Sequence, residues 1–262
     1  MKDMIDFTAK MSIYELLALI VSVVALIAPI IKWAWKKWFK KARLNYLPNG
    51  TANLFFNQSG SYLRIDGVYE ALNKPVSIKN ITVSVKRKRD DAKLNLSWSY
   101  FISPVNQNLV GNYIQTTEKA HPFRIDVDSI ACAFIEFADS SDSFGKAFRL
   151  STKELFAQAQ QSSVFYQKYD DAVTAYRETK EYLQSMNTIE KYFFWEIGKY
   201  DIVICAEFGK EKKEFHFAMY IDEEGHKKLH ENIDESLVAP LKKAYGVAWN
   251  FQNAVVAIAG EN

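Results

Sequence analysis

The chain has 262 residues, of which 48% are apolar and 24% are charged. This composition argues against extended disorder and suits one large domain or two small ones with a sizeable core. Positive charge is concentrated at the start, because residues 1–43 hold 8 Lys/Arg and 3 Asp/Glu while the remainder is mildly acidic. A mildly acidic body argues against a general nucleic-acid-binding protein, and no nucleic-acid partner is expected.

Residues 13–35 predict a single transmembrane helix, preceded by a short tail of residues 1–12. The central stretch, residues 16–31, contains no charge. At about 1.5 Å per residue the whole span reaches roughly 34 Å, which exceeds the ~30 Å hydrocarbon core of a bilayer. A cleaved signal peptide would carry its basic residues before the apolar run, and an interfacial helix would show a polar face. A buried core helix would not usually carry the tryptophans and lysines that follow this run.

Tryptophans alternate with basic residues around the start of the juxtamembrane segment, residues 36–50. Indole rings concentrate at the headgroup level, and lysines beside them meet lipid phosphates on the cytoplasmic side. The expected contacts with the lipid bilayer are Trp33, Trp35, Lys36, Lys37, Trp38, Lys40, Lys41 and Arg43. The pattern predicts a single-pass protein of a bacterial inner (cell) membrane, with its N-terminus outside and residues 51–262 in the cytoplasm.

The body, residues 51–262, is predicted to be mainly β because apolar and polar residues alternate along it. Ile81, Val83 and Val85 would share one face of a strand, and the charged run after them would form a hairpin tip. About eight or nine such strands without βαβ alternation predict antiparallel sheets. Tyr200 stands just after a corner at the start of a strand, a position used in immunoglobulin-like sandwiches, where its hydroxyl bonds back to the backbone. The predicted fold is therefore an immunoglobulin-like antiparallel β-sandwich behind an N-terminal transmembrane helix.

Two helical segments accompany the predicted strands. Ser151–Glu154 matches a capping box, and the stretch after it lacks Gly and Pro, so a helical insertion is expected over about residues 152–192. The run KAFRL before it is expected to be a strand. A C-terminal helix is expected over about residues 223–245, and the apolar tail AVVAIAG is expected to dock on the core.

The two cysteines, Cys132 and Cys205, lie within apolar runs and are expected to be buried free thiols in a reducing compartment. A disulfide between them is the alternative. Four glycosylation sequons, at Asn49, Asn57, Asn80 and Asn95, would not meet the glycosylation machinery on a cytoplasmic body.

Sequence motifs for catalysis or cofactor binding are absent: there is no Gly-rich phosphate loop, no C-x-x-C pair and no H-E-x-x-H. The candidate metal ligands are His226 and His230, whose i, i+4 spacing places both imidazoles on one helix face with Glu223 and Asp234. A solvated, Lys/Glu-rich helix face is the favoured interpretation of the same residues. No catalytic residue and no cofactor are therefore predicted.

These observations predict a membrane-anchored protein whose cytoplasmic domain is a binding, scaffolding or sensing module with a protein partner, or one that self-associates. A non-enzymatic role is favoured. Two alternatives stay open: a membrane-anchored, metal-dependent hydrolase that uses His226 and His230, and a defence effector whose transmembrane helix perturbs the bilayer. The basic run Lys86–Arg89 is expected to be a solubilising hairpin tip, or a lipid contact if it lies near the membrane.

Overall fold

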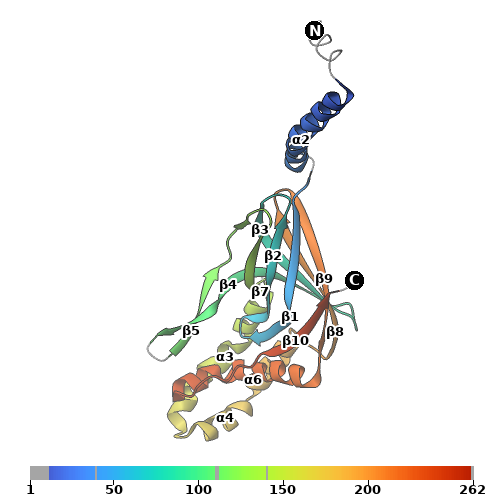
Figure 1. Ribbon diagram of the computed structural model, residues 1–262. Coiled ribbons are helices and arrows are strands. Elements are labelled where there is room, and N and C mark those ends of the chain that lie inside the picture. The colour runs from blue at the N-terminus through green and yellow to red at the C-terminus, as the bar shows by residue number, and fades with distance from the viewer. Residues whose placement is uncertain (1–11, 39, 110–111, 140, 261–262) are drawn as a thin grey trace.

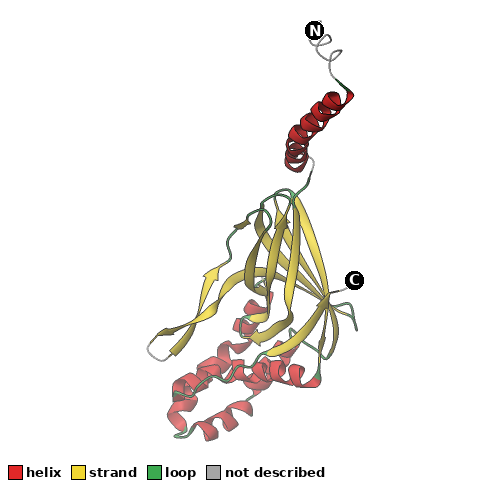
Figure 2. Cartoon of the chain, viewed as in Figure 1, coloured by secondary structure: helices red, strands yellow, loops and turns green. Residues whose placement is uncertain are grey.

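The computed structural model describes residues 12–38, 40–109, 112–139 and 141–260, and the side chains of residues 36–38, 103–109, 112–115 and 163 lie outside the description. Helix α2 (Ile13–Trp38) extends away from one end of a β-rich body (Figure 1). The other helices gather at the opposite end of the strands (Figure 2). The long axis of the protein therefore runs from α2 through the strands to a helical layer.

Among the described residues, ten antiparallel strands form one sheet that closes on itself. They are β1 (Arg43–Asn57), β2 (Gly60–Leu72), β3 (Val76–Arg87), β4 (Lys93–Leu109), β5 (Asn112–Lys119), β6 (Phe123–Ile125), β7 (Ser129–Asp139), β8 (Gly198–Phe208), β9 (Glu211–Ile221) and β10 (Ala254–Gly260). Eight of them form a closed barrel in the order β4-β7-β2-β1-β10-β9-β8-β3, and β3 pairs with β4 to complete the ring. Strand β5 extends β4 away from the barrel, and β6 pairs with the start of β3.

The prediction of an immunoglobulin-like sandwich is wrong, and the C-terminal segment shows why. AVVAIAG is strand β10 rather than a tail docked on the core. It lies between β1 and β9, where Ala254 pairs with Leu54 and Ile258 pairs with Met219. The β3–β4 hairpin closes the other side of the ring. A sandwich and a barrel share the same alternation along each strand, so the sequence pattern predicts the strands but not which strand edges meet.

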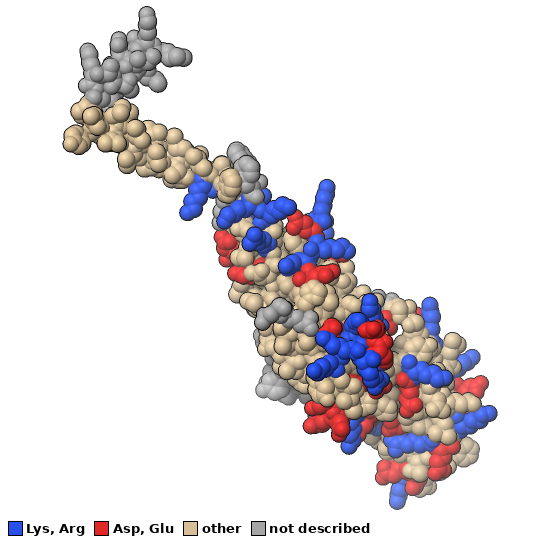
Figure 3. Space-filling view, turned by 90° about the vertical axis from the view of Figure 1, so that its right-hand side faces the viewer, with Lys and Arg blue, Asp and Glu red and all other residues tan. Residues whose placement is uncertain are grey.

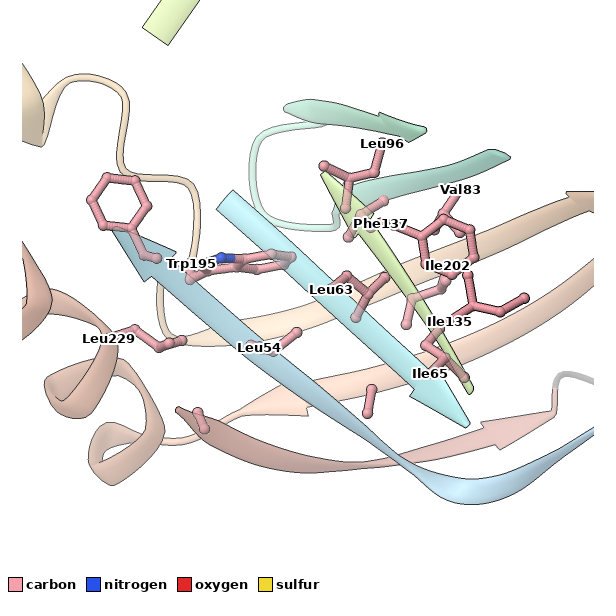
Figure 4. Close-up of a cluster of buried hydrophobic side chains, with 14 of the residues drawn as sticks. Leu54, Leu63, Ile65, Val83, Leu96, Ile135, Phe137, Trp195, Ile202 and Leu229 are labelled. Carbon is pink, nitrogen blue, oxygen red and sulfur yellow. The ribbon is translucent and has the colours of Figure 1, made fainter. Parts of the chain in front are cut away.

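Apolar side chains fill the barrel interior. The strand residues that point inward are at most 2% exposed at positions such as Leu63, Ile65, Val83, Ile135 and Phe137. Figure 4 shows these side chains meeting inside the sheet, with Trp195 and Leu229 at one side of the cluster. A ring of eight strands encloses a space about wide enough for side chains alone. Each large apolar side chain buried there stabilises the fold by about 1.5–3 kcal/mol.

Strand β1 bends where it passes Gly67 of β2. The pairing register slips between Pro48 and Ala52, so the bulge lies on β1 while Gly67 stays paired. A Cβ atom at Gly67 would lie 2.6 Å from the hydroxyl of Tyr46. Because the glycine lacks that atom, the Tyr46 ring fits over β2 and is only 8% exposed.

Four helices pack at the end of the barrel far from α2: α3 (Ser143–Phe165), α4 (Tyr169–Arg177), α5 (Lys180–Glu190) and α6 (Glu223–Tyr245). Helix α3 already contains KAFRL and Ser151, so the predicted strand and the predicted capping box there are both wrong. The Thr152 hydroxyl instead donates to the carbonyl of Phe148 at 2.8 Å, one turn earlier. Phe144 and Phe148, four residues apart, are both buried. An apolar run this short fits a helix and a strand equally well.

Aromatic side chains bond to the backbone where the helical layer meets the barrel. The Tyr176 hydroxyl donates to the Leu155 carbonyl at 3.1 Å and so joins α4 to α3. Trp195 is fully buried, and its Nε1 donates to the Phe55 carbonyl of β1 at 3.2 Å. The Tyr200 hydroxyl donates to the Glu196 carbonyl at 2.6 Å, which is the bond back to the backbone expected from the sequence. This local corner therefore forms without an immunoglobulin-like fold around it.

Helix α2 contributes nothing to the core of the body. The most apolar 18-residue window within the span Ile13–Trp35 has a mean hydropathy of 2.4, and none of that window is buried. The helix is long and apolar enough to cross a membrane, and a signal sequence would pass the same test.

Candidate binding groove

A cavity of about 550 Å³ lies on the outer face of the barrel, over β1, β2 and β7. Outward side chains of these three strands form its wall, and the segment that follows α6 forms one edge. The lining residues are Asn53, Phe55, Asn57, Tyr62, Arg64, Glu136, Phe251 and Asn253. Arg64 is the register partner of both Asn53 and Glu136, so these three side chains stand in one row across the strands. We call this space the barrel cavity.

Charged and ionisable groups are among the residues that line the barrel cavity. The Arg64 guanidinium donates to Asp66 at 3.0 Å. Burial raises the pKa of the Glu136 carboxyl above its ordinary value, and the positive charge of Arg64 opposes this shift. Burial also raises the pKa of the Tyr62 hydroxyl. The cavity therefore offers a partly dehydrated carboxyl, a phenol and a guanidinium, and hydrogen bonds to a ligand are stronger in such surroundings than in open water.

Aromatic rings and side-chain amides form the rest of the wall. The Phe55 ring centroid lies 6.3 Å from that of Tyr62 and 6.1 Å from that of Phe251. Asn253 donates to the side-chain oxygen of Asn53 at 3.2 Å. Amides both donate and accept hydrogen bonds, and flat rings pack against apolar groups. This mixture is typical of a site for a ligand that alternates polar and apolar groups.

The segment that edges the cavity, residues 246–253, is fixed by a buried asparagine of α6. Asn232 is fully buried. Its side chain donates to the Gln252 carbonyl at 2.6 Å and accepts from the Gln252 N–H at 2.8 Å. Breaking such a pair would leave buried polar groups unsatisfied, which costs about 1–3 kcal/mol per group. The backbone at Gln252 is therefore held in one position.

A second buried side chain of α6 fixes the middle of the same segment. Glu235 is 8% exposed, accepts from the Asn250 N–H at 2.7 Å and pairs with Lys242 at 2.7 Å. The charge of Lys242 compensates the buried carboxylate, so the network is satisfied. We call Asn232, Glu235 and Lys242 the polar clamp.

A second cavity, of about 620 Å³, lies between the clamped segment and helices α3 and α6. Its lining residues are Gln58, Phe156, Gln160, Ala239, Pro240, Lys243, Ala244, Trp249 and Phe251. We call it the helix cavity, and since both cavities include Phe251, we call the two together the bipartite groove. Trp249 is 58% exposed although the clamp fixes the backbone on its C-terminal side. The protein thus displays a large indole from an ordered segment.

The predicted metal ligands lie away from the groove. The rings of His226 and His230 are 5.7 Å apart, and His230 lies 3.7 Å from the Glu190 carboxylate. Asp234, which the helical spacing placed beside them, instead pairs with Arg177 at 2.5 Å. Within the described part of the chain, no group of three His, Cys, Asp or Glu side chains is arranged to hold a metal ion.

The predicted membrane-interface residues lie at the end of α2 and in the linker to β1. Trp33 and Trp35 are 59% and 57% exposed. Lys40, Lys41 and Arg43 are exposed as well. The side chains of Lys36, Lys37 and Trp38 lie outside the described residues.

The basic hairpin Lys86–Arg89 lies at the helical end of the barrel, because Arg87 is the register partner of Tyr200. Its charges are paired locally: Arg87 binds Asp90 at 2.8 Å and Lys86 binds Asp91 at 2.5 Å. The hairpin is therefore remote from α2, and its position favours the solubilising role over a lipid contact.

Cys132 and Cys205 are free, but the expectation that they are buried is wrong. Cys132 is exposed and Cys205 is half-buried. Each stands at an outward position beside an inward neighbour, Ala133 and Ile204, that is at most 1% exposed. Apolar residues occupy both the inward and the outward positions of these strands. The sequence pattern therefore did not show on which face each cysteine lies.

Comparisons with known proteins show no family for this chain. No protein-family profile matches it, and no curated protein matches it. A solved structure of a family 123 glycoside hydrolase from Clostridium perfringens, described for glycolipid glycan hydrolysis, overlaps 68% of this chain at 10% identity and a TM-score of 0.26. The chain spans 26% of that protein, and a likeness this distant supports no conclusion about function.

Sequence reasoning missed the bipartite groove because its residues are scattered along the chain. They come from strands β1 and β2, from Glu136 of β7, from helices α3 and α6 and from the segment after α6. The one sequence signal is the run Trp249-Asn250-Phe251-Gln252-Asn253, which alternates aromatic rings with amides. Only the barrel register and the polar clamp show that this run faces the outer side of β1 and β2.

Proposed function

We propose that the protein is a single-pass, membrane-anchored binding module. In this proposal α2 crosses a bacterial inner membrane, the barrel stands in the cytoplasm, and the bipartite groove binds an extended segment of a partner protein. The anchor is supported by the apolar, unburied α2 and by the exposed Trp33 and Trp35 at its end. The basic residues after them favour a cytoplasmic body under the positive-inside rule.

The observation that carries the binding role is the polar clamp beneath Trp249. Buried polar networks cost stability unless every group is satisfied, and this one serves to fix a segment whose largest side chain stays in solvent. Large aromatic side chains on a fixed backbone are the usual anchors of binding interfaces. A pre-organised site also avoids the entropy cost of ordering a loop when a partner binds.

A peptide segment fits the groove better than a small charged ligand. The two cavities share Phe251 as a lining residue, and together they offer sites over the outer face of the barrel and against helices α3 and α6. Asn53, Asn57 and Gln58 can satisfy a peptide backbone, whose donors and acceptors alternate. The aromatic rings between them suit the apolar side chains of the same peptide.

Photo-crosslinking in intact membranes tests the binding role. The photoreactive residue p-benzoylphenylalanine replaces Trp249, and in a matched control it replaces Leu183, which is 54% exposed on α5. We expect a discrete adduct from position 249 only, and its loss when Phe55→Ala is added. An adduct of twice the chain mass would assign the partner as a second copy. Equal adduct patterns from positions 249 and 183 would refute the groove as a binding site.

The proposed orientation can be tested with the exposed Cys132 in a Cys205→Ser background. A membrane-impermeant maleimide should label Cys132 only after the inner membrane is permeabilised. Labelling of intact spheroplasts would place the barrel on the outer side and overturn the cytoplasmic assignment.

A further inference from the structure

The barrel end next to α2 is formed by the chain entry and three loops, which we call the proximal rim. Asn73 donates to the Lys41 carbonyl at 3.2 Å, and the Asp128 N–H donates to the Ala71 carbonyl at 2.8 Å. Strand β3 starts there beside β6 and beside the end of β8. Residues 40–43, 73–75, 126–128 and 209–210 therefore belong to one surface.

Basic residues outnumber acidic ones on the proximal rim and the adjoining strand ends. The basic residues are Lys40, Lys41, Arg43, Lys74, Lys79, Arg124, Lys210, Lys212 and Lys213, and the acidic residues are Glu70, Asp126, Asp128, Glu207, Glu211 and Glu214. In helices α3 to α6, at the other end, acidic residues slightly outnumber basic ones. Figure 3 shows blue side chains where α2 meets the body, with red ones among them and further blue ones lower on the body. The proximal rim thus carries a net positive charge, and the basic hairpin Lys86–Arg89 at the helical end is paired with Asp90 and Asp91.

The linker to α2 keeps this rim close to the end of the helix. Helix α2 ends at Trp38 and β1 begins at Arg43. An extended chain covers at most about 3.6 Å per residue, so the five steps between these residues span no more than roughly 18 Å. If α2 crosses the bilayer, the proximal rim lies within reach of the lipid headgroups.

Two apolar side chains project from the same region. Val127 is 39% exposed on the loop between β6 and β7, and Ile130 is 67% exposed at the start of β7. Apolar groups among basic residues suit the interfacial zone of a membrane, where they enter the acyl boundary while cations meet phosphates.

We infer that the proximal rim is a second membrane-binding surface, specific for anionic lipid headgroups, which holds the barrel against the bilayer independently of α2. The inference rests on the proposed crossing of the membrane by α2. Binding of the proximal rim to the membrane would orient the barrel. The helical layer would then point into the cytoplasm, and the bipartite groove would lie at a fixed distance from the membrane.

The test uses the body without α2, residues 40–262. The buried core lies wholly between Leu44 and Ile258, and α2 adds nothing to it, so the body contains its complete folding unit. Binding is measured by co-sedimentation with vesicles of pure phosphatidylcholine and of phosphatidylcholine with phosphatidylglycerol. We expect binding to the anionic vesicles only, with a steep loss as salt is raised.

Charge reversal identifies the surface. The rim variant carries Lys41→Glu, Lys74→Glu and Lys210→Glu, and the control variant reverses three exposed lysines of the helical end, Lys153, Lys180 and Lys191. We expect the rim variant to bind anionic vesicles at least tenfold more weakly than the wild type and the control to change less than twofold. Circular dichroism and thermal unfolding verify that both variants are folded.

Two outcomes would overturn the inference: equal binding to both kinds of vesicle, or equal weakening by the rim and control variants. The proposed anchor is tested separately, on the full chain. If α2 does not cross the membrane, alkaline carbonate should extract the full chain from membranes. A full chain that resists carbonate while the body ignores anionic vesicles would leave the anchor intact and refute the rim alone.

Discussion

The inner and outer faces of β1, β2 and β7 carry opposite chemistry although the same strands build both. Inward residues such as Leu54, Leu63 and Ile135 are at most 2% exposed and belong to one cluster of buried apolar side chains. Outward residues of the same strands supply the amides, aromatic rings and charges of the barrel cavity. The inner face needs only apolar volume, whereas the outer face needs particular groups in register. Stability therefore resides inside the barrel, and binding capacity resides on its surface.

Strand β7 gives the strongest test of the difference between the inner and outer faces, because it has a phenylalanine on each face. Phe137 is 1% exposed inside the barrel, and Phe134 is half-buried on the outside. We expect Phe137→Ala to lower the free energy of unfolding by about 3–5 kcal/mol, because it leaves a cavity in a packed interior. The matched change Phe134→Ala should cost less than about 1 kcal/mol. Equilibrium denaturation of the body measures both, and equal losses would mean that the outer face is a second core.

The polar clamp contributes both to the stability of the fold and to the order of the segment that edges the groove. Asn232→Ala removes both hydrogen bonds to Gln252 and should lower the free energy of unfolding by about 2–3 kcal/mol, because buried backbone groups lose their partners. Hydrogen exchange should become faster in residues 249–253. Lys227→Ala, at an exposed position on the same helix, is the control and should change neither quantity. A stable Asn232→Ala protein with unchanged exchange would show that the clamp does not order the groove.

The close approach of Tyr46 to β2 gives a third test of the inner face. Gly67→Ala places a Cβ atom 2.6 Å from the Tyr46 hydroxyl and should destabilise the body by overpacking, by about 1–3 kcal/mol. Gly260→Ala is the matched change in open space and should be neutral. Adding Tyr46→Leu to Gly67→Ala should recover part of the loss in thermal unfolding, and failure to recover would mean that the strain lies in the backbone.

The smallest effect is expected from the outer face, at Glu136. Its pKa in the folded protein is raised, chiefly by burial, so the folded state binds a proton more tightly than the unfolded state. The stability of the wild type should therefore fall as pH rises from the ordinary range of a glutamate through the raised value. Glu136→Gln removes the ionisable carboxyl group, so the free energy of unfolding of the variant should rise relative to that of the wild type as pH increases. Urea titrations of both proteins at several pH values measure this difference. A difference between the two proteins that does not vary with pH would show that Glu136 is well hydrated.

The sequence by itself predicted the elements that depend on local patterns. The apolar span of α2 follows from composition, and the inward set Ile81, Val83 and Val85 follows from strict alternation. The bond from Tyr200 back to the backbone follows from a corner and a strand start that are neighbours in the chain. Where the pattern was short or ambiguous, as in KAFRL, local reasoning chose the wrong element.

Only the tertiary structure decided how the strands close and which outward residues meet. A two-residue period fixes the face of the sheet on which a side chain lies, but it does not identify the neighbouring strand. The sandwich and the barrel were therefore equally compatible with the sequence pattern. The position of β10 between β1 and β9 resolved the fold, and it also brought Phe251 and Asn253 beside Phe55 and Asn53. The groove could not be predicted for the same physical reason: contacts between strands depend on long-range pairing, and the energy that selects this pairing belongs to the whole core and not to any one segment.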